Sequence, residues 1–281
     1  MKLKRVFLTA LAGLLMISLC ACGEGDNNTE DSKSASQASE AVQDASADNN
    51  GSQSDVKDGN NKGSYPEDEP TGNTLSADWF DDAVFIGDSV TLKLSYYAED
   101  GALGKADFLC AGSLGYNNAL MGIDEEGNVH PTYQGEKYTV DEGIKTIGKK
   151  KVFIMLGMND IGLYGVDGAI DGMKKLTERI LEKTPDAKLY FQSVTPMIEG
   201  NTLGNLTNDA IAEFDEQLRA VCKEKGYKYL NVASAVSDEN GNLIYDYCGD
   251  PPTDDNPDAM GLHFTDTGCQ KWVDYLCTHV S

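Results

Sequence analysis

Four residues able to take part in acyl transfer each lie beside an apolar segment of this 281-residue chain. Ser89 follows Val84-Phe85-Ile86-Gly87-Asp88, and Asn159 follows Lys151–Gly157. Gly115 comes shortly after a third apolar run, and His263 precedes a closing amphipathic segment. A serine beside a histidine base is a nucleophile, while backbone N–H groups and an asparagine amide stabilise an oxyanion. These residue types therefore predict a serine-based acyl-transfer site.

The stretch around Ser89 has two readings when it is taken alone. The apolar run from Val84 to Ile86 is typical of a buried strand, and Gly-Asp is a turn signal at its end. A serine at the end of such a strand is well placed for chemistry, because crevices of open α/β sheets lie there. Equally, Asp88 or Ser89 could simply cap a helix that begins at Val90.

Only three histidines are available to act as the base. His279 is the third residue from the end of the sequence, on a closing helix, where a surface location is expected. His130 stands beside Pro131 in an irregular excursion. His263 follows the last strand and a long acidic loop, and comes just before the closing helix, so we expect it at the catalytic edge of the sheet.

Apolar strands and amphipathic helices alternate five times along the chain. Such alternation predicts a five-stranded parallel sheet with helices on both faces, a three-layer α/β/α fold. The strands are expected in five segments: 84–89, 106–110, 151–157, 189–194 and 227–232. The helices are expected over 90–98, from Thr139, over 166–180 and 211–221, and after the cap residue Thr265.

The order of these motifs resembles the SGNH, or GDSL, hydrolases, a family of esterases and acylhydrolases with a flavodoxin-like fold. The resemblance covers residues 80–281 and rests on Ser89 in Phe-Ile-Gly-Asp-Ser, on Gly115, on Asn159 in Gly-Met-Asn-Asp, and on His263. It implies that Ser89 attacks the ester, that His263 is the base, and that the oxyanion is held by the Ser89 N–H, Gly115 and Asn159. We expect no cofactor and no metal.

The last motif departs from the family pattern, which places an aspartate three residues before the histidine. Here Met260 occupies that position, and the nearest upstream acid is Asp258, with Asp254 and Asp255 beyond it. Either Asp258 orients His263, or a backbone carbonyl supports a Ser-His pair. An α/β-hydrolase elbow is disfavoured, because Thr91 stands where its second glycine belongs.

The first residues predict export and anchoring. Residues 1–21 have a basic start and a short apolar stretch, as in a secretory signal, and Leu19-Cys20-Ala21-Cys22 resembles a bacterial lipobox that would be lipidated at Cys22. An ordinary signal peptide or a single anchor helix remains the alternative. Residues 22–77 carry almost no large apolar side chains and predict a disordered acidic tether, leaving 78–281 as the hydrolase domain.

The net charge excludes some classes of binding partner, and the cysteine content bears on disulfides and metal sites. The 46 acidic and 23 basic residues give a formal net charge of −23, which argues against nucleic acid and against direct adsorption to anionic lipid. Apart from the lipobox, an odd number of cysteines requires at least one free thiol. They are expected mostly as small buried side chains, and none has metal-ligand spacing: Cys110, Cys222, Cys248, Cys269 and Cys277.

These observations predict a lipid-anchored extracytoplasmic esterase that removes O-acetyl or other short acyl groups from a small-molecule or carbohydrate ester, such as a cell-wall polymer. One alternative is an O-acetyltransferase that uses the same Ser89 and His263, with a sugar hydroxyl in place of water. A third is a glycan- or solute-binding lipoprotein with an inactive site.

Overall fold

The computed structural model describes residues 65–66 and 68–280, and the signal, the lipobox and most of the tether lie outside them. Its main sheet has five parallel strands, as predicted, and their order is β2-β1-β5-β6-β7. The bounds are β1 Ala83–Gly87, β2 Asp107–Cys110, β5 Lys151–Met155, β6 Lys188–Gln192 and β7 Lys228–Leu230. A separate two-stranded hairpin, β3 Thr132–Tyr133 and β4 Glu136–Lys137, interrupts the alternation.

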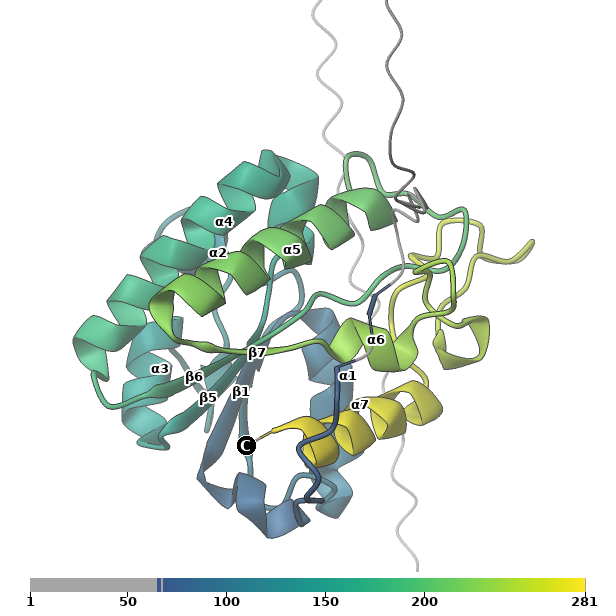
Figure 1. Ribbon diagram of the computed structural model, residues 1–281. Coiled ribbons are helices and arrows are strands. Elements are labelled where there is room, and N and C mark those ends of the chain that lie inside the picture. Colours follow the sequence, from purple (N-terminus) through teal and green to yellow (C-terminus); the bar gives the residue numbers. More distant parts are fainter. Residues whose placement is uncertain (1–64, 67, 281) are drawn as a thin grey trace, which may run out of the picture. The chain divides into compact units, whose positions relative to one another are not determined.

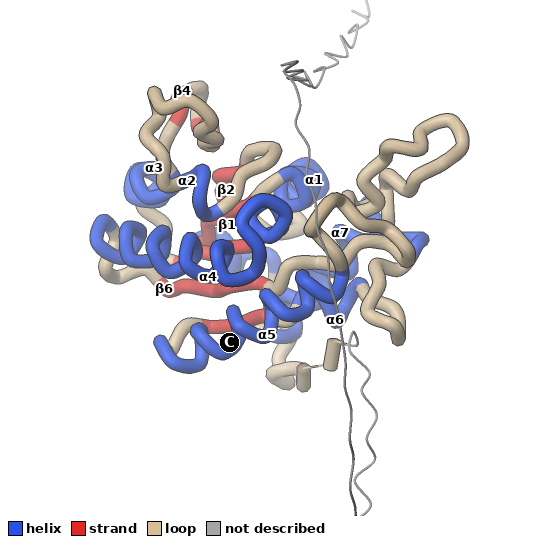
Figure 2. The backbone as a smooth tube through the Cα atoms, turned by 90° about the horizontal axis from the view of Figure 1, so that it is seen from above, coloured by secondary structure: helices blue, strands red, loops and turns tan. Residues whose placement is uncertain are grey.

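Helices cover both faces of this sheet and give the expected three layers (Figures 1 and 2). On one side lie α3, α4 and α5, and on the other lie α1 and α7 (Figure 1). Their bounds are α1 Ser89–Tyr97, α2 Tyr116–Ala119, α3 Val140–Ile147, α4 Met158–Lys183, α5 Asn208–Lys225, α6 Val232–Val236 and α7 Asp266–His279. The described part of the chain also contains three short 3₁₀ helices: η1 Ala77–Asp82, η2 Ala98–Asp100 and η3 Tyr245–Tyr247.

An aromatic ladder crosses the sheet and fixes its register. Phe85 of β1 pairs in register with Phe108 of β2 and Phe153 of β5, and Phe153 pairs with Tyr190 of β6. The ring centroids are 5.2, 4.6 and 4.6 Å apart along this row, with nearly parallel planes. A slip of one residue would turn every ring to the opposite face, so this ladder helps to bring the strand ends level.

The helix starts agree only in part with the sequence prediction. Thr265 caps α7 by accepting a hydrogen bond from the Gly268 N–H. Thr139 precedes α3 but makes no side-chain cap. Helix α4 begins at Met158, eight residues before the predicted start, and is kinked at Gly165, where φ is 70°. This early start makes Asn159 part of a helical turn directly at the end of β5.

The described segment before η1 packs on the domain, although the tether was predicted to extend to residue 77. The Pro66 carbonyl accepts a hydrogen bond from the Asn231 side chain just after β7, and the Leu75 N–H donates to Cys277. Asp68 accepts a hydrogen bond from the Tyr275 hydroxyl. Described residues that were assigned to the tether therefore pack on the hydrolase domain. Within residues 65–66 and 68–280, no helix is both long and apolar enough to cross a bilayer.

Candidate active site

The loop between β1 and α1 presents Ser89 at the carboxyl edge of the sheet. Gly87 ends the strand, and a Cβ there would lie 1.9 Å from the Thr91 hydroxyl, so the turn requires glycine. Asp88 is the N-cap of α1 and accepts a hydrogen bond from the Val90 N–H at 2.9 Å. The helix-cap role and the nucleophile role predicted for this stretch are thus compatible, because Asp88 caps the helix while the Ser89 hydroxyl remains available for reaction.

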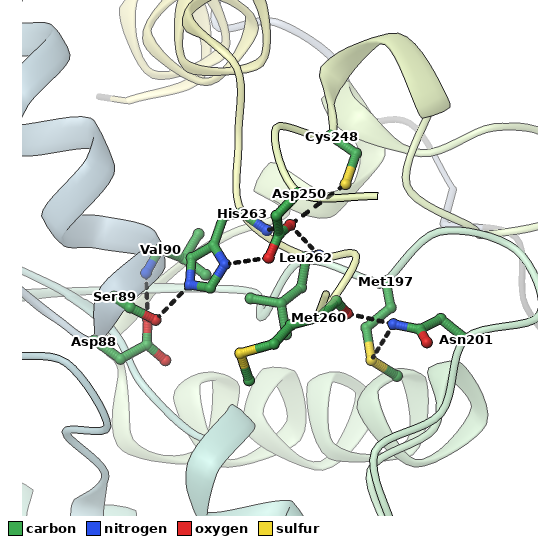
Figure 3. Close-up of polar contacts among 10 residues, drawn as sticks. All are labelled: Asp88, Ser89, Val90, Met197, Asn201, Cys248, Asp250, Met260, Leu262 and His263. Atoms are coloured by element: carbon green, nitrogen blue, oxygen red, sulfur yellow. Dashed lines mark hydrogen bonds and ion pairs between the residues drawn. The ribbon is translucent and has the colours of Figure 1, made fainter. Parts of the chain in front are cut away.

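Ser89 and His263 meet, although 174 residues separate them in the chain. The Ser89 Oγ lies 2.8 Å from His263 Nε2, and both residues are partly exposed (Figure 3). On its other side, His263 Nδ1 is 2.6 Å from Asp250 Oδ2. The carboxylate requires the proton on Nδ1, which leaves Nε2 free to accept the serine proton. This is the hydrogen-bonded chain of a Ser-His-Asp triad.

The predicted role of Asp258 is wrong in this structure, because Asp250 supplies the carboxylate. Asp258 is exposed, in the part of the loop that projects beyond the site. The two sides of the loop pair with each other: the Gly249 N–H donates to the His263 carbonyl at 2.7 Å, and the Gly261 N–H donates to the Asp250 carbonyl at 2.9 Å. This pairing places Asp250 opposite His263 and forces residues 251–260 outward.

Asp250 is held by donors on both carboxylate oxygens. Its Oδ1 accepts the Leu262 and His263 N–H groups at 3.0 and 2.9 Å, and the Cys248 Sγ lies 3.5 Å away (Figure 3). These hydrogen bonds and the adjacent His263 lower the pKa of Asp250, against the opposing effect of its partial burial. Asp250 therefore remains a carboxylate that fixes the imidazole. Sequence distance alone offered no signal for it, since Asp250 lies thirteen positions before His263.

Asn159 lies between the ends of β1 and β2, as its predicted role requires. Its Nδ2 donates to the Leu114 carbonyl at 3.1 Å and to Asp88 Oδ2 at 3.3 Å. Gly115 adjoins Leu114, and Ser89 adjoins Asp88, so the amide links the two segments that carry the other predicted oxyanion donors, and both of its N–H groups are engaged in doing so. The Gly115 N–H, however, already donates to Asn118 Oδ1 at 2.8 Å.

Asp160 fixes the turn that contains Gly115. Its buried carboxylate accepts hydrogen bonds from the N–H groups of Tyr116 and Asn117 at 2.7 and 2.9 Å, and from the Asn117 side chain at 2.9 Å. A Cβ on Gly115 would lie 2.6 Å from Asp160 Oδ2. Burial raises the pKa of Asp160, and the N–H donors oppose that effect.

The two other histidines make contacts elsewhere in the fold, and the predicted lipidation site lies outside the described residues. His130 contacts the Met121 carbonyl, and His279 stacks on Tyr275, with ring centroids 4.0 Å apart. Cys22 lies in the part of the chain that is not described. Within residues 65–66 and 68–280, the five cysteines are free thiols and no cluster of His, Cys, Asp and Glu could hold a metal ion.

Comparison with known proteins identifies the family. The GDSL-like lipase/acylhydrolase family matches residues 85–271, a range that includes Ser89, Asp250 and His263. The chain belongs to this family. The protein is accordingly an SGNH-type serine esterase. No curated protein matches this sequence significantly.

Solved structures agree on the fold. A GDSL-like lipase from Bacteroides thetaiotaomicron is 17% identical, with a TM-score of 0.50 over 69% of this chain and 84% of that one. A proposed acylhydrolase from Bacteroides fragilis is 17% identical, with a TM-score of 0.51 over 69% and 83%. A G-D-S-L family lipolytic protein from Desulfitobacterium hafniense is 15% identical, with a TM-score of 0.50 over 69% and 97%. At these identities the likeness supports the α/β/α architecture.

Proposed function

We propose that this esterase removes acetyl or other short acyl groups from a carbohydrate or related neutral ester through an acyl-enzyme. The observation that supports the acyl-enzyme route is the continuous contact from Asp250 through His263 to Ser89, at 2.6 and 2.8 Å. Such a chain activates a serine hydroxyl for attack on an ester carbonyl.

In the first half-reaction, Ser89 Oγ bonds to the carbonyl carbon while His263 Nε2 takes the serine proton. The imidazolium is stabilised by Asp250, and the carbonyl oxygen, now negative, is held by N–H donors around Asn159. When the intermediate collapses, the ester C–O bond breaks and His263 returns the proton to the departing alcohol. Water then attacks the acyl-Ser89 ester, His263 takes a proton from it, and the free acid leaves as Ser89 is reprotonated.

Two features of the chain favour a neutral sugar ester over an anionic lipid. The net charge of −23 disfavours approach to anionic surfaces. In addition, Tyr164 and Tyr245 are 54% and 62% exposed, on the segments that contain Asn159 and precede Asp250. Exposed tyrosines combine an apolar ring with a hydroxyl, which suits the mixed surface of a sugar.

The test combines active-site labelling with substrate profiling. Wild-type protein should react with a fluorophosphonate probe, and Ser89→Ala should not. A panel of acetyl, butyryl and octanoyl esters, with and without sugar acceptors, should show hydrolysis of the short esters, and acyl transfer to the sugars would indicate the transferase alternative. Failure of the wild-type protein both to label and to hydrolyse any ester would favour an inactive binding protein.

We further propose that Cys22 is lipidated and holds the enzyme at the outer face of the cytoplasmic membrane. The supporting feature is the Leu19-Cys20-Ala21-Cys22 sequence after a short apolar stretch. Cys22→Ser should release the protein from the membrane fraction without changing its specific esterase activity. Full membrane association of that variant would refute lipidation at this residue.

A further inference from the structure

The Gly115 N–H is already engaged in the structure. It donates to Asn118 Oδ1 at 2.8 Å, and the same side chain donates from Nδ2 to the Ser113 carbonyl at 2.8 Å. A backbone amide has one proton, so this N–H cannot bind a substrate oxygen while the bond to Asn118 persists. Within residues 65–66 and 68–280, no partner appears for the N–H of Ser89.

The backbone around Gly115 has little room to adjust. The Asp160 carboxylate holds the next two N–H groups, those of Tyr116 and Asn117, and lies where a Cβ on Gly115 would be. Asn118, in contrast, is half-buried at the protein surface. Freeing the Gly115 N–H therefore requires the Asn118 side chain to move while the backbone stays in place.

We propose that Asn118 is a gate on the oxyanion hole of this enzyme. Its side-chain oxygen occupies the position that the substrate's carbonyl oxygen takes during acyl transfer, and it rotates away when the ester binds. The inference rests on the proposed acyl-enzyme route. It makes Asn118 a positioning residue that controls how many donors the oxyanion receives.

Departure of Asn118 also changes the turn before Gly115. Ser113 has a φ of 62°, an unusual backbone conformation for a residue with a side chain, and its carbonyl is bound by Asn118 Nδ2. When the Asn118 side chain rotates, the exposed Ser113 carbonyl accepts a hydrogen bond from water instead. Because Ser113 lies at the surface, the exchange costs only part of a hydrogen bond, which is consistent with a movable side chain.

Asn118→Ala separates the gate from an ordinary helix cap. If Asn118 is a gate, alanine leaves the Gly115 N–H free for substrate, and kcat/KM for a short ester should rise about two- to twelvefold, the usual worth of one hydrogen bond. If Asn118 is only a cap that supports the turn, the same change should lower kcat/KM. The two roles therefore predict effects of opposite sign.

Asn118→Asp tests the gate by strengthening the acceptor for the Gly115 N–H instead of removing it. The carboxylate accepts the Gly115 N–H more strongly and adds negative charge beside the developing oxyanion, so a gate predicts a loss of more than tenfold. A cap predicts only a small loss, because aspartate at this third helical position still accepts the Gly115 N–H and gives up only the bond from Nδ2 to the exposed Ser113 carbonyl. Asn128→Ala is the matched control, because the Asn128 side chain also binds loop carbonyls, in the 122–128 turn away from Ser89.

The measurements are kcat/KM for a short aryl ester, the rate of fluorophosphonate labelling and the melting temperature of each variant. Faster labelling and hydrolysis in Asn118→Ala, with Asn128→Ala at the wild-type rate, support the gate. An active wild-type enzyme in which Asn118→Ala is slower, or equal, overturns the gate alone. A wild-type protein with neither reaction overturns the proposed function and the gate together.

Discussion

Replacing Asp250 by asparagine tests the triad at the residue that the sequence did not reveal. In the wild-type protein, Oδ1 accepts the N–H groups of Leu262 and His263, while Oδ2 accepts the proton on His263 Nδ1. An asparagine must keep its oxygen toward the two backbone N–H groups, because an NH₂ there would face two donors. Its NH₂ then faces Nδ1 and turns that nitrogen into an acceptor.

This reversal puts the imidazole proton on Nε2, which faces Ser89 Oγ at 2.8 Å. A protonated Nε2 cannot take the serine proton, so kcat should fall by up to about 10⁴-fold, as known for other serine triads in the wrong tautomer. Steady-state hydrolysis of a short aryl ester measures the loss, with circular dichroism to confirm folding.

Asp258→Asn is the matched control, since that exposed side chain makes no contact with His263 in the described structure and should retain wild-type kcat. A loss of less than about tenfold in Asp250→Asn, or an equal loss in Asp258→Asn, would refute the assignment of the carboxylate.

Three further predictions concern the oxyanion donors and their support. Asn159→Ala should lower kcat by about 10²- to 10³-fold with little change in KM, measured on the same ester, because it removes one donor to the oxyanion. Gly115→Ala should lower the melting temperature, since its Cβ would lie 2.6 Å from Asp160 Oδ2, and differential scanning calorimetry would detect this. Burial raises the pKa of Asp88 from its usual value of 3.8 to about 6. Between these two pH values the folded protein binds more protons at Asp88 than the unfolded chain does, so the free energy of unfolding falls as the pH rises through this range. Urea unfolding at pH 4.5 and 7 should show that pH dependence in wild type and a weaker one in Asp88→Asn; equal dependence in both would refute it.

The sequence was sufficient to predict the features that depend on local pattern. Each strand is a short apolar run, and each crossover helix has its own periodicity, so five strands and a three-layer fold could be predicted without knowing any contact. Ser89, Asn159 and His263 were found for the same reason, because each lies at the end of an element. Parallel strands bring their carboxyl ends to one edge, where the structure joins Ser89 to His263.

Only the tertiary structure decided which groups face one another across loops. Asp250 reaches His263 through two backbone hydrogen bonds, from Gly249 to His263 and from Gly261 to Asp250, and no sequence spacing could reveal them. The bond from Gly115 to Asn118 likewise depends on the turn conformation at Ser113. The packing of the segment around Pro66 on the domain depends in the same way on its bond to the distant Asn231 side chain. Hydrogen bonds of this kind require two distant segments at a fixed separation, and that separation exists only once the core has packed.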